Sequence, residues 1–194
     1  MVPQVMLDPG HGGDDPGATG VDGLLEKDLN LAVALKVRAH LGRRPFFDCA
    51  LTRQADVSVD LLKRSEMANA DPANVLFVSI HHNGATDPRA CGSEIFYQNR
   101  SPDSAAFAAI LERQLAAKVN LPWRRTVFRL NAAGTADYYS VLRNTRCPSV
   151  IAEVGFVTCP DEAPVLRENW FQELVALAIA DSVEQWMHHV WRGA

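Results

Sequence analysis

Four side chains in this sequence are suited to metal or acid–base chemistry: His11, Glu26, His81 and Glu153. Each lies in or beside an apolar run or at the start of a helical pattern, and none belongs to a short local motif such as His-Glu-x-x-His. Two imidazoles and one carboxylate can hold Zn²⁺ and leave a fourth position open, as catalytic zinc sites do. His11, Glu26 and His81 fit that set, and Glu153 is our candidate for the general base beside it.

The segment around His11, residues 7–18, contains four glycines and two prolines among twelve residues. Glycine permits positive φ or close approach and proline fixes φ, so this loop has a special backbone shape that a plain turn would not need. Two ordinary explanations stay open from the residues alone. His11 could be a turn histidine bonded to a carbonyl, and Glu26 could be an acid favoured by the helix dipole in a first helical turn.

A pair of adjacent histidines, His81 and His82, follows the apolar run Val75–Ile80. Successive residues of an extended chain point to opposite sides, so at most one of the pair can face His11.

Two glutamates compete for the role of general base. Glu153 lies inside the apolar run Ser149–Phe156, where a carboxylate is costly unless it opens into a cleft. Glu94 lies near the start of an expected strand, which favours a supporting or structural part for it.

The elements that must position these groups alternate between strands and helices. Short apolar runs predict strands at 5–7, 46–53, 75–80, 91–97 and 149–156. Apolar residues at a 3.6-residue period predict helices at 26–41 and 60–70, a helix that begins at the Ser101-Pro102 signal, and one at 170–191. Residues 121–146 show no clear pattern. This order predicts an α/β fold with a mostly parallel, twisted sheet and helices on both faces, which brings His11, His81 and Glu153 to one edge.

Length and composition suit a single domain over residues 1–194. The net charge of −4 gives no electrostatic footprint for nucleic acid, and no apolar run approaches the ~20 residues of a bilayer span. We therefore expect neither nucleic-acid binding nor membrane insertion. Because the N-terminus lacks the pattern of a signal peptide, we expect a chain that is exported by other means, is encoded by a phage, or has been trimmed.

The four cysteines are Cys49, Cys91, Cys147 and Cys159. They are far apart and form no Cys-x-x-Cys pair, which argues against a zinc ribbon or a redox motif. We expect buried free thiols rather than a disulfide.

Several spaced motifs also occur in one order along the chain. They are Leu-Asp-Pro-Gly-His-Gly-Gly from Leu7 with Asp15-Pro16-Gly17-Ala18, Glu26-Lys27-Asp28-Leu29-Asn30-Leu31, Leu51-Thr52-Arg53, Arg64 with Ala68-Asn69, Ser79-Ile80-His81, and Glu153-Val154-Gly155-Phe156. In this order they resemble the zinc-dependent N-acetylmuramoyl-L-alanine amidases of bacterial cell-wall remodelling and phage lysis. The resemblance spans nearly the whole chain and is weak only at about 98–145.

The resemblance implies zinc on His11, Glu26 and His81 and catalysis by Glu153. The implied reaction is hydrolysis of the amide between the lactyl group of N-acetylmuramic acid and the L-alanine of the peptidoglycan stem peptide. The implied place of action is the cell wall, periplasmic or extracellular, with a wall-binding module or an activator supplied separately. The residues expected to bind substrate or to support the site are Glu94, Asn83, Arg53 and Arg64.

Two residues depart from the family's pattern. His82 stands where a small residue is usual and could add a second imidazole near the cleft, and Cys159 stands where an asparagine commonly follows the Gly-Phe pair. Two other functions stay open. One is a related zinc aminopeptidase or carboxypeptidase, and the other is a non-catalytic peptidoglycan-binding domain of the same fold, against which the retention of every expected ligand argues.

Overall fold

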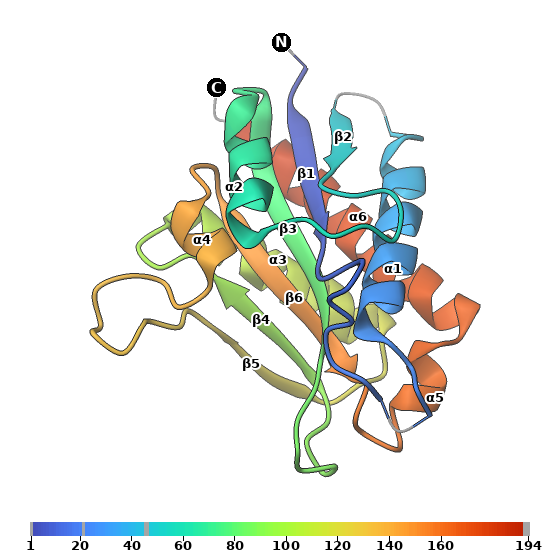
Figure 1. The fold of residues 1–194 in the computed structure, drawn as a ribbon. Helices are drawn as coiled ribbons and strands as arrows, with labels where there is room; N and C mark the ends of the chain where they lie inside the picture. Colours follow the sequence, from blue (N-terminus) through green and yellow to red (C-terminus); the bar gives the residue numbers. More distant parts are fainter. Residues whose placement is uncertain (1, 21, 45–46, 192–194) are drawn as a thin grey trace.

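Strands and helices alternate along the computed structural model, which describes residues 2–20, 22–44 and 47–191 (Figure 1). The strands are β1 (Gln4–Pro9), β2 (Asp48–Leu51), β3 (Asn74–Asn83), β4 (Ser93–Tyr97), β5 (Trp123–Val127) and β6 (Ser149–Phe156). The helices are α1 (Glu26–Leu41), α2 (Leu61–Ala70), α3 (Pro102–Lys118), α4 (Ser140–Asn144), α5 (Ala163–Leu166) and α6 (Asn169–Trp191). Within this described part of the chain, no helix is long and apolar enough to cross a bilayer.

The strands form one six-stranded sheet in the order β2-β1-β3-β6-β4-β5. β2, β1, β3 and β6 pair in parallel, whereas β4 is antiparallel to β6 and β5 is parallel to β4. The reversal follows from the connection between β3 and β4, which contains no helix to return the chain to the opposite edge of the sheet. The expected mostly parallel sheet is confirmed, with a reversed pair at one side.

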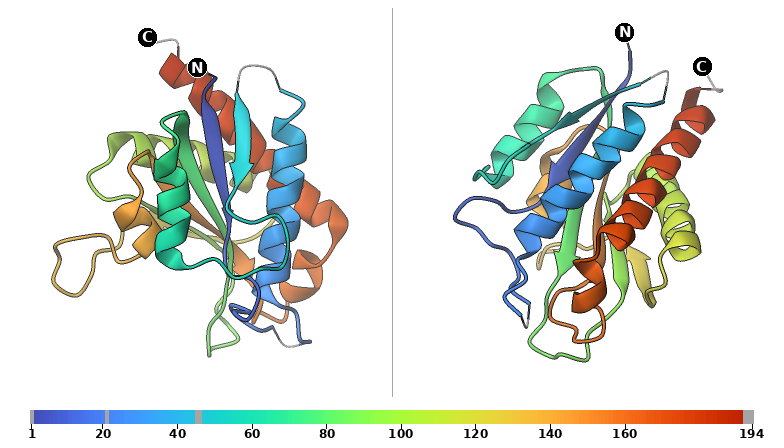
Figure 2. Two further views of the ribbon diagram at one scale, coloured as in Figure 1. Left: turned by 45° about the horizontal axis from the view of Figure 1, so that its top comes forward. Right: turned by 90° about the vertical axis from the view of Figure 1, so that its right-hand side faces the viewer.

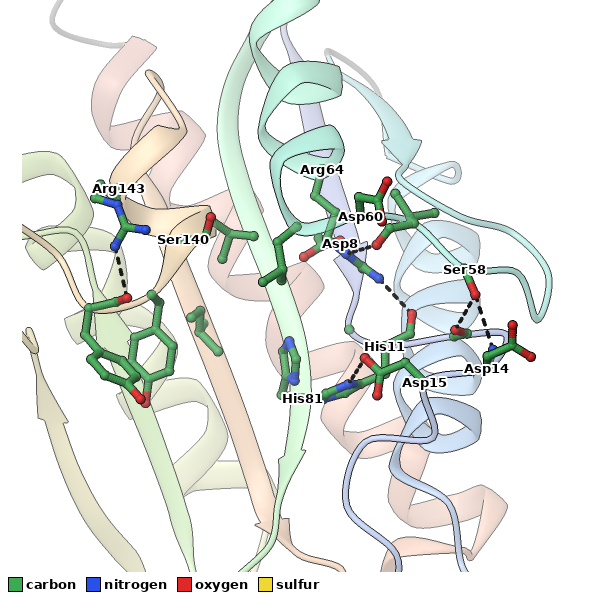
Figure 3. A pocket seen from close by; sticks show the side chains of 18 residues that line it. Asp8, His11, Asp14, Asp15, Ser58, Asp60, Arg64, His81, Ser140 and Arg143 are labelled. Atoms are coloured by element: carbon green, nitrogen blue, oxygen red, sulfur yellow. Dashed lines mark hydrogen bonds and ion pairs between the residues drawn. The ribbon is translucent and has the colours of Figure 1, made fainter. Parts of the chain in front are cut away.

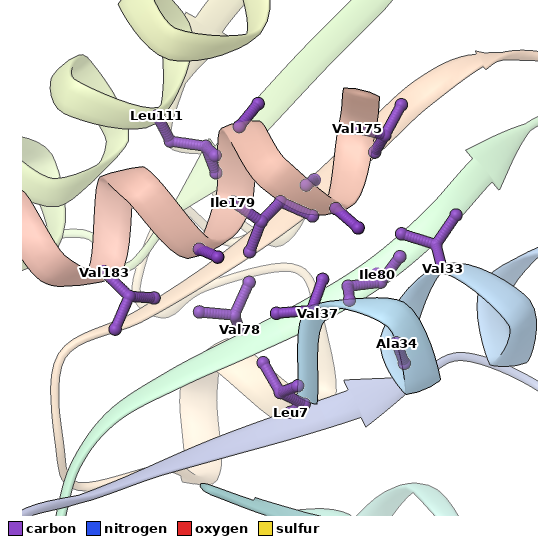
Figure 4. Close-up of a cluster of buried hydrophobic side chains, with 14 of the residues drawn as sticks. Leu7, Val33, Ala34, Val37, Val78, Ile80, Leu111, Val175, Ile179 and Val183 are labelled. Atoms are coloured by element: carbon purple, nitrogen blue, oxygen red, sulfur yellow. The ribbon is translucent and has the colours of Figure 1, made fainter. Parts of the chain in front are cut away.

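Helices cover both faces of this sheet, as expected (Figure 2). α1, α3 and α6 pack on one face, and α2 and α4 pack on the other. β3 alternates accordingly, since Val78 and Ile80 belong to the larger core beneath α1 and α6, and Phe77 belongs to the smaller core beneath α2 and α4. Figure 4 shows Val78 and Ile80 among side chains of α1 and α6, such as Val37 and Ile179.

Helix α3 illustrates how the local sequence sets the end of an element. The hydroxyl of Ser101 accepts a hydrogen bond from the backbone N of Ser104 at 3.2 Å, and Pro102 occupies the first turn. A serine cap satisfies one free N–H of the helix start, and proline has no N–H to leave unpaired there. The Ser101-Pro102 signal is thereby confirmed.

Some elements differ in extent from the prediction. β2 covers only Asp48–Leu51 of the expected 46–53, and residue 46 lies outside the described residues. β3 continues to Asn83, so both adjacent histidines lie within the strand rather than after it. The stretch 121–146 contains strand β5, in which no residue is fully buried, and the five-residue helix α4, which are too short and too polar to produce a period.

The expectation of free thiols is wrong for one pair of cysteines. Cys91 and Cys159, 68 residues apart in sequence, form a disulfide, while Cys49 and Cys147 are free. The loop before β4 and the loop after β6 meet at the same edge of the sheet, and this meeting is a property of the topology that cysteine spacing does not reveal. Burial raises the pKa of the Cys49 thiol to about 12 and that of Cys147 to about 11.

Candidate metal and catalytic site

His11 lies in the loop after β1, and its φ of 60° falls in the left-handed region that non-glycine residues seldom occupy. Two glycines let this loop close tightly on its surroundings. A Cβ at Gly10 would overlap the ring of His81, and a Cβ at Gly17, where φ is 65°, would overlap Glu26 and the ring of His11. The glycine-rich composition therefore reflects backbone packed directly against His81 and Glu26.

The three expected ligands converge at this loop. Nε2 of His11 lies 3.2 Å from Oε2 of Glu26, and Nδ1 of His81 lies 2.8 Å from Oε1 of the same carboxylate. The two imidazole rings are edge to face, with centroids 5.0 Å apart. Glu26 is buried at the start of α1, where the backbone N of Ala18 donates to Oε2 at 2.8 Å. The fold thus assembles these side chains from β1's loop, α1 and β3.

This donor set fits a zinc ion. One candidate ligand atom from each of His11, Glu26 and His81 lies within 4.8 Å of the others. Ligand atoms of a tetrahedral zinc site are roughly 3.3 Å apart, given bonds of about 2.0–2.1 Å. The nitrogen–oxygen separations of 2.8 and 3.2 Å are close to that spacing. Two imidazoles and one carboxylate also leave a fourth vertex free for a reactant.

Mutual attraction shifts the titration of these groups. Burial raises the pKa of Glu26, but its hydrogen bonds with His11 and His81 have the larger effect and hold that pKa well below the ordinary range of a carboxyl group. Burial lowers the pKa of His81, but the hydrogen bond to Glu26 and the charge of Glu153 outweigh it and raise that pKa to about 9. Glu26 is therefore ionised at neutral pH, as a metal ligand must be.

Asp15 orients the imidazole of His11. Its Oδ2 accepts a hydrogen bond from Nδ1 of His11 at 2.8 Å (Figure 3), which leaves Nε2 directed at Glu26. A carboxylate on the second ring nitrogen is a usual partner of a metal-binding histidine. Asp15 is part of one sequence motif, but its spacing from His11 within an irregular loop gave no signal of this role.

Glu153 lies on β6 between two other polar side chains of the sheet. It pairs with His81 of β3 on one side and with Glu94 of β4 on the other. Paired residues point to the same face, so all three project toward the layer of α2 and α4. Burial raises the pKa of Glu153 to about 7, the charge of His81 opposes this, and the charges of Glu26 and Glu94 add to it. A carboxyl group with a pKa near 7 is suited to accepting and returning a proton.

Glu94 is engaged in other contacts. The carboxylate is 3% exposed, its Oε1 accepts a hydrogen bond from Nε of Arg124 at 2.8 Å, and the same oxygen forms an ion pair with Nη2 of Arg125 at 3.0 Å. Its Oε2 accepts from Nδ2 of Asn83 at 3.1 Å. Two guanidinium groups thus offset a negative charge beside Glu153. These contacts favour a supporting role for Asn83 and for Glu94, rather than a role for Glu94 as the general base.

Arg53 and Arg64 are both buried and both hold the backbone of the His11 loop. Arg53 donates to the carbonyls of Pro9 at 3.0 Å and Gly10 at 2.9 Å. Arg64 donates to Oδ1 of Asp8 at 2.7 Å and to the carbonyl of His11 at 2.8 Å. Most of the N–H groups of these guanidinium groups donate to other atoms of the chain. The geometry therefore favours a role in holding the His11 loop over a role in binding substrate.

His82 does not lie near the cleft, and the expectation of a second imidazole there is wrong. The side chain is 1% exposed on the opposite face of β3, where its Nδ1 lies 2.8 Å from Oδ1 of Asn30 in α1. Because β3 continues through both histidines, the alternation of side chains places His82 beneath α1. Burial lowers its pKa to about 4.

A cleft of about 800 Å³ opens beside His11 and His81 (Figure 3). Its two walls differ in chemistry, since acidic side chains line the wall from the β1 loop and the segment before α2, and aromatic and basic ones line the wall around α4. Glu26 and Glu153 are not among the residues that line it. The charged and aromatic residues of the two walls include Asp14, Asp15, Asp60, Tyr138, Tyr139 and Arg143.

The wall around α4 comes from the stretch 121–146, whose sequence shows no clear period and whose clustered arginines are its one hint of a rim for stem-peptide carboxylates. Tyr138 and Tyr139 line the cleft, and the guanidinium of Arg129 lies 4.0 Å from the centroid of the Tyr138 ring. Arg143 also lines the cleft, whereas Arg146 lies in a separate depression beside α2. An aromatic pair followed by a basic helix turn is the signal that could have marked this wall.

Comparison with known proteins gives consistent matches over almost all of the chain. A family model described as N-acetylmuramoyl-L-alanine amidase matches residues 5–185. The N-acetylmuramoyl-L-alanine amidase AmiA of Salmonella typhimurium is 33% identical over 95% of this chain and 76% of its own length. The solved catalytic domain of CwlV, an N-acetylmuramoyl-L-alanine amidase from Bacillus (Paenibacillus) polymyxa, is similar with a TM-score of 0.87 and 33% identity over 96% of this chain and 98% of that one. The CwlD amidase of Clostridioides difficile, solved in complex with the GerS lipoprotein, gives a TM-score of 0.86 at 28% identity over 96% and 98% of the two chains.

Proposed function

This chain belongs to the N-acetylmuramoyl-L-alanine amidase family and is a peptidoglycan amidase, and we propose that its activity depends on zinc held by His11, Glu26 and His81. The bond cleaved joins the lactyl group of N-acetylmuramic acid to the L-alanine of the stem peptide, and residues 1–194 act as one catalytic domain. One observation supports this most strongly. Both oxygens of the buried Glu26 carboxylate lie at 2.8–3.2 Å from ring nitrogens of two histidines, and one of these, His81, is the strand partner of the catalytic candidate Glu153.

The reaction needs a polarised carbonyl, an activated water and a protonated leaving group. Zinc held by these residues would supply the Lewis acidity that polarises the scissile carbonyl. Glu153 takes a proton from water as the water oxygen bonds to the carbonyl carbon, and it returns that proton to the alanine nitrogen as the C–N bond breaks. The products are the lactyl carboxylic acid and a stem peptide with a free amino terminus.

The remaining expected site residues support this centre in our proposal. Arg53 and Arg64 hold the loop that carries His11, while Asn83 and Glu94 flank Glu153 from β3 and β4. None of these side chains is assigned a bond to substrate. The acidic and aromatic walls of the cleft are then the surfaces that receive the glycan and the stem peptide.

The test combines metal analysis with product analysis. We expect about one zinc per chain by plasma emission, loss of activity on chelation, and recovery on adding Zn²⁺. Mass spectrometry of a digested muropeptide should show an intact stem peptide and an intact disaccharide. Release of single amino acids would instead identify an aminopeptidase or carboxypeptidase, and binding without hydrolysis would identify a wall-binding module. Full activity in chelator, with no bound transition metal, would contradict zinc dependence.

The place of action follows from the substrate. Peptidoglycan forms the cell wall, and the amidases to which this chain is similar act there. We propose that the chain works in the periplasm or outside the cell. The disulfide between Cys91 and Cys159 supports this, since disulfides persist in oxidising compartments. CwlD was solved in complex with a lipoprotein, and we propose that this chain likewise works with a separate activator or wall-binding module.

A further inference from the structure

A chain of buried hydrogen bonds runs from His82 to the Glu26 carboxylate. Nδ1 of His82 lies 2.8 Å from Oδ1 of Asn30, and both side chains are almost completely buried beneath α1, 1% and 0% exposed. Nδ2 of Asn30 in turn donates to Oε1 of Glu26 at 3.3 Å and to the carbonyl of Gly10 at 3.2 Å. These bonds link β3, α1 and the loop of His11 beneath the site.

The direction of each hydrogen bond in this chain is fixed by chemistry. A carboxylate and a backbone carbonyl can only accept, so the amide nitrogen of Asn30 must face Glu26 and Gly10. The amide oxygen of Asn30 must then face His82, and the imidazole must carry its hydrogen on Nδ1. A side chain at position 82 that lacks a donor would leave the Asn30 amide oxygen buried and unpaired. The side-chain amide of Asn30 could then rotate and exchange the positions of its oxygen and nitrogen.

We propose that His82 is a positioning residue for the metal site. Through Asn30 it holds Glu26 and the Gly10 carbonyl in the orientation that directs both carboxylate oxygens toward His11 and His81. This inference rests on the proposed function, because it takes Glu26 as a ligand. His82 itself touches neither substrate nor metal, and it acts from the face of β3 that is opposite to the cleft.

A purely structural role is the competing explanation, and it makes a different prediction. If His82 only filled core volume, any side chain of similar size would serve. Nε2 of His82 has no hydrogen-bond partner among the residues that the structure describes, so Nδ1 provides the one polar contact of its ring there. The donor at Nδ1, rather than the volume of the ring, is therefore what a test must remove.

The experiment measures zinc affinity of metal-stripped protein by competition with a chromogenic chelator. His82→Leu keeps most of the volume and removes the donor, and we expect zinc to bind at least about tenfold more weakly. His82→Asn places an amide group where Nδ1 lies and should restore affinity close to wild type. Val78→Ala, on the same strand and the same face, is the matched control. It should lower the stability of the metal-free protein and leave zinc affinity unchanged.

Coupling to Asn30 provides the second measurement. Asn30→Ala should weaken zinc binding, and adding His82→Leu to it should weaken binding no further, because both changes break the same chain. If His82→Leu fails to fold, the comparison of His82→Asn with Asn30→Ala still decides the matter. Wild-type affinity in His82→Leu or in Asn30→Ala would overturn the inference. Failure of the wild-type chain to bind zinc would overturn the proposed function instead.

Discussion

Glu153 lies beside His81 because the two are paired residues on neighbouring parallel strands. A shift of β3 by one residue would turn His81 toward α1 and bring His82 to the cleft. The backbone N of His82 donates to Oε1 of Glu26 at 3.3 Å, so the carboxylate also helps to hold this register. The spacing between the expected ligands and the expected base is thus set by one strand pairing rather than by loop flexibility.

Glu153→Gln tests the proposed base. Glutamine keeps the shape of the side chain but cannot take a proton, so we expect kcat on a soluble muropeptide to fall by at least ~10²-fold with zinc still bound. Activity assays with metal analysis on the same preparation provide the measurement.

Glu94→Gln is the matched control for this substitution, because Glu94 faces Glu153 across the strand pair but is bonded to Arg124 and Arg125. It should lower kcat less. Loss of zinc from Glu153→Gln would show that Glu153 is a ligand, and the base would have to be another residue.

Among single residues, the sequence indicated the candidate ligands and the candidate base, but it did not indicate the residues that hydrogen-bond to them. His11, Glu26 and His81 were candidates because residue types that bind metals lie at strand ends and at the start of a helix, and because the family motifs contain them. The role of Asp15 depends on the left-handed backbone of His11, and that of Asn30 depends on the packing of α1 against β3. Neither interaction is visible in the spacing of residues. Asn30 lies four positions after Glu26 on a helix, which is the one local hint that existed.

Among the elements, long periodic segments were predictable and short polar ones were not. The helix predicted at 26–41 spans Glu26–Leu41, because a full stripe of apolar residues faces the core. β5 and α4 have few buried side chains, and their place depends on contacts with β4 and α2 rather than on their own pattern. The reversed direction of β4 follows from the connection after β3, which contains no helix.

The helix layer of α1, α3 and α6 carries a pH-sensitive ion pair. Oδ1 of Asp181 on α6 bonds to Nη2 of Arg44 after α1, and Oδ2 lies 3.0 Å from Nζ of Lys118 at the end of α3. Burial raises the pKa of Asp181, but the hydrogen bonds to Arg44 and Lys118 outweigh it and lower that pKa. Stabilisation is then complete above the unfolded-state pKa of about 3.9 and is lost as pH falls through the lower folded-state value.

Asp181→Asn should therefore lower the free energy of unfolding by about 1 kcal/mol at pH 7. The difference from wild type should shrink below about pH 4. Urea titrations of both proteins at pH 7 and pH 3 measure it, with Asp87→Asn as a control because its pair with Arg89 lies on the surface. An unchanged difference at pH 3 would show that the carboxylate charge is not the cause.

The disulfide that joins the loops before β4 and after β6 can be tested by counting free thiols. Alkylation of the denatured chain without reductant should label two cysteines, Cys49 and Cys147, and reduction first should raise the number to four. The native protein should react slowly, because burial raises both free thiols' pKa values far above neutral. Mass spectrometry provides the count, and four labels without reductant would exclude the disulfide.

The molecule as a whole carries a net charge of −4, and its cleft is unevenly charged. Asp14, Asp15 and Asp60 line one wall, while Arg143 and the tyrosines line the other. A local arrangement of this kind can orient a ligand with charged groups at close range. It contributes little at long range, because exposed charges are screened beyond about 8–10 Å at physiological salt.

We therefore expect the isolated chain to hydrolyse a soluble muropeptide efficiently and intact sacculi poorly. Peptidoglycan carries carboxylates, and a chain of like net charge gains no attraction to it from a distance. A fused wall-binding module would raise the effective concentration of substrate at the cleft without any new contact there, so it should restore activity on sacculi and leave kcat on the muropeptide unchanged. Turnover assays on both substrates, with co-sedimentation of the chain with sacculi, measure this. Tight sedimentation of the isolated chain at physiological salt would contradict it, because a surface that binds the wall by itself would leave the module nothing to supply.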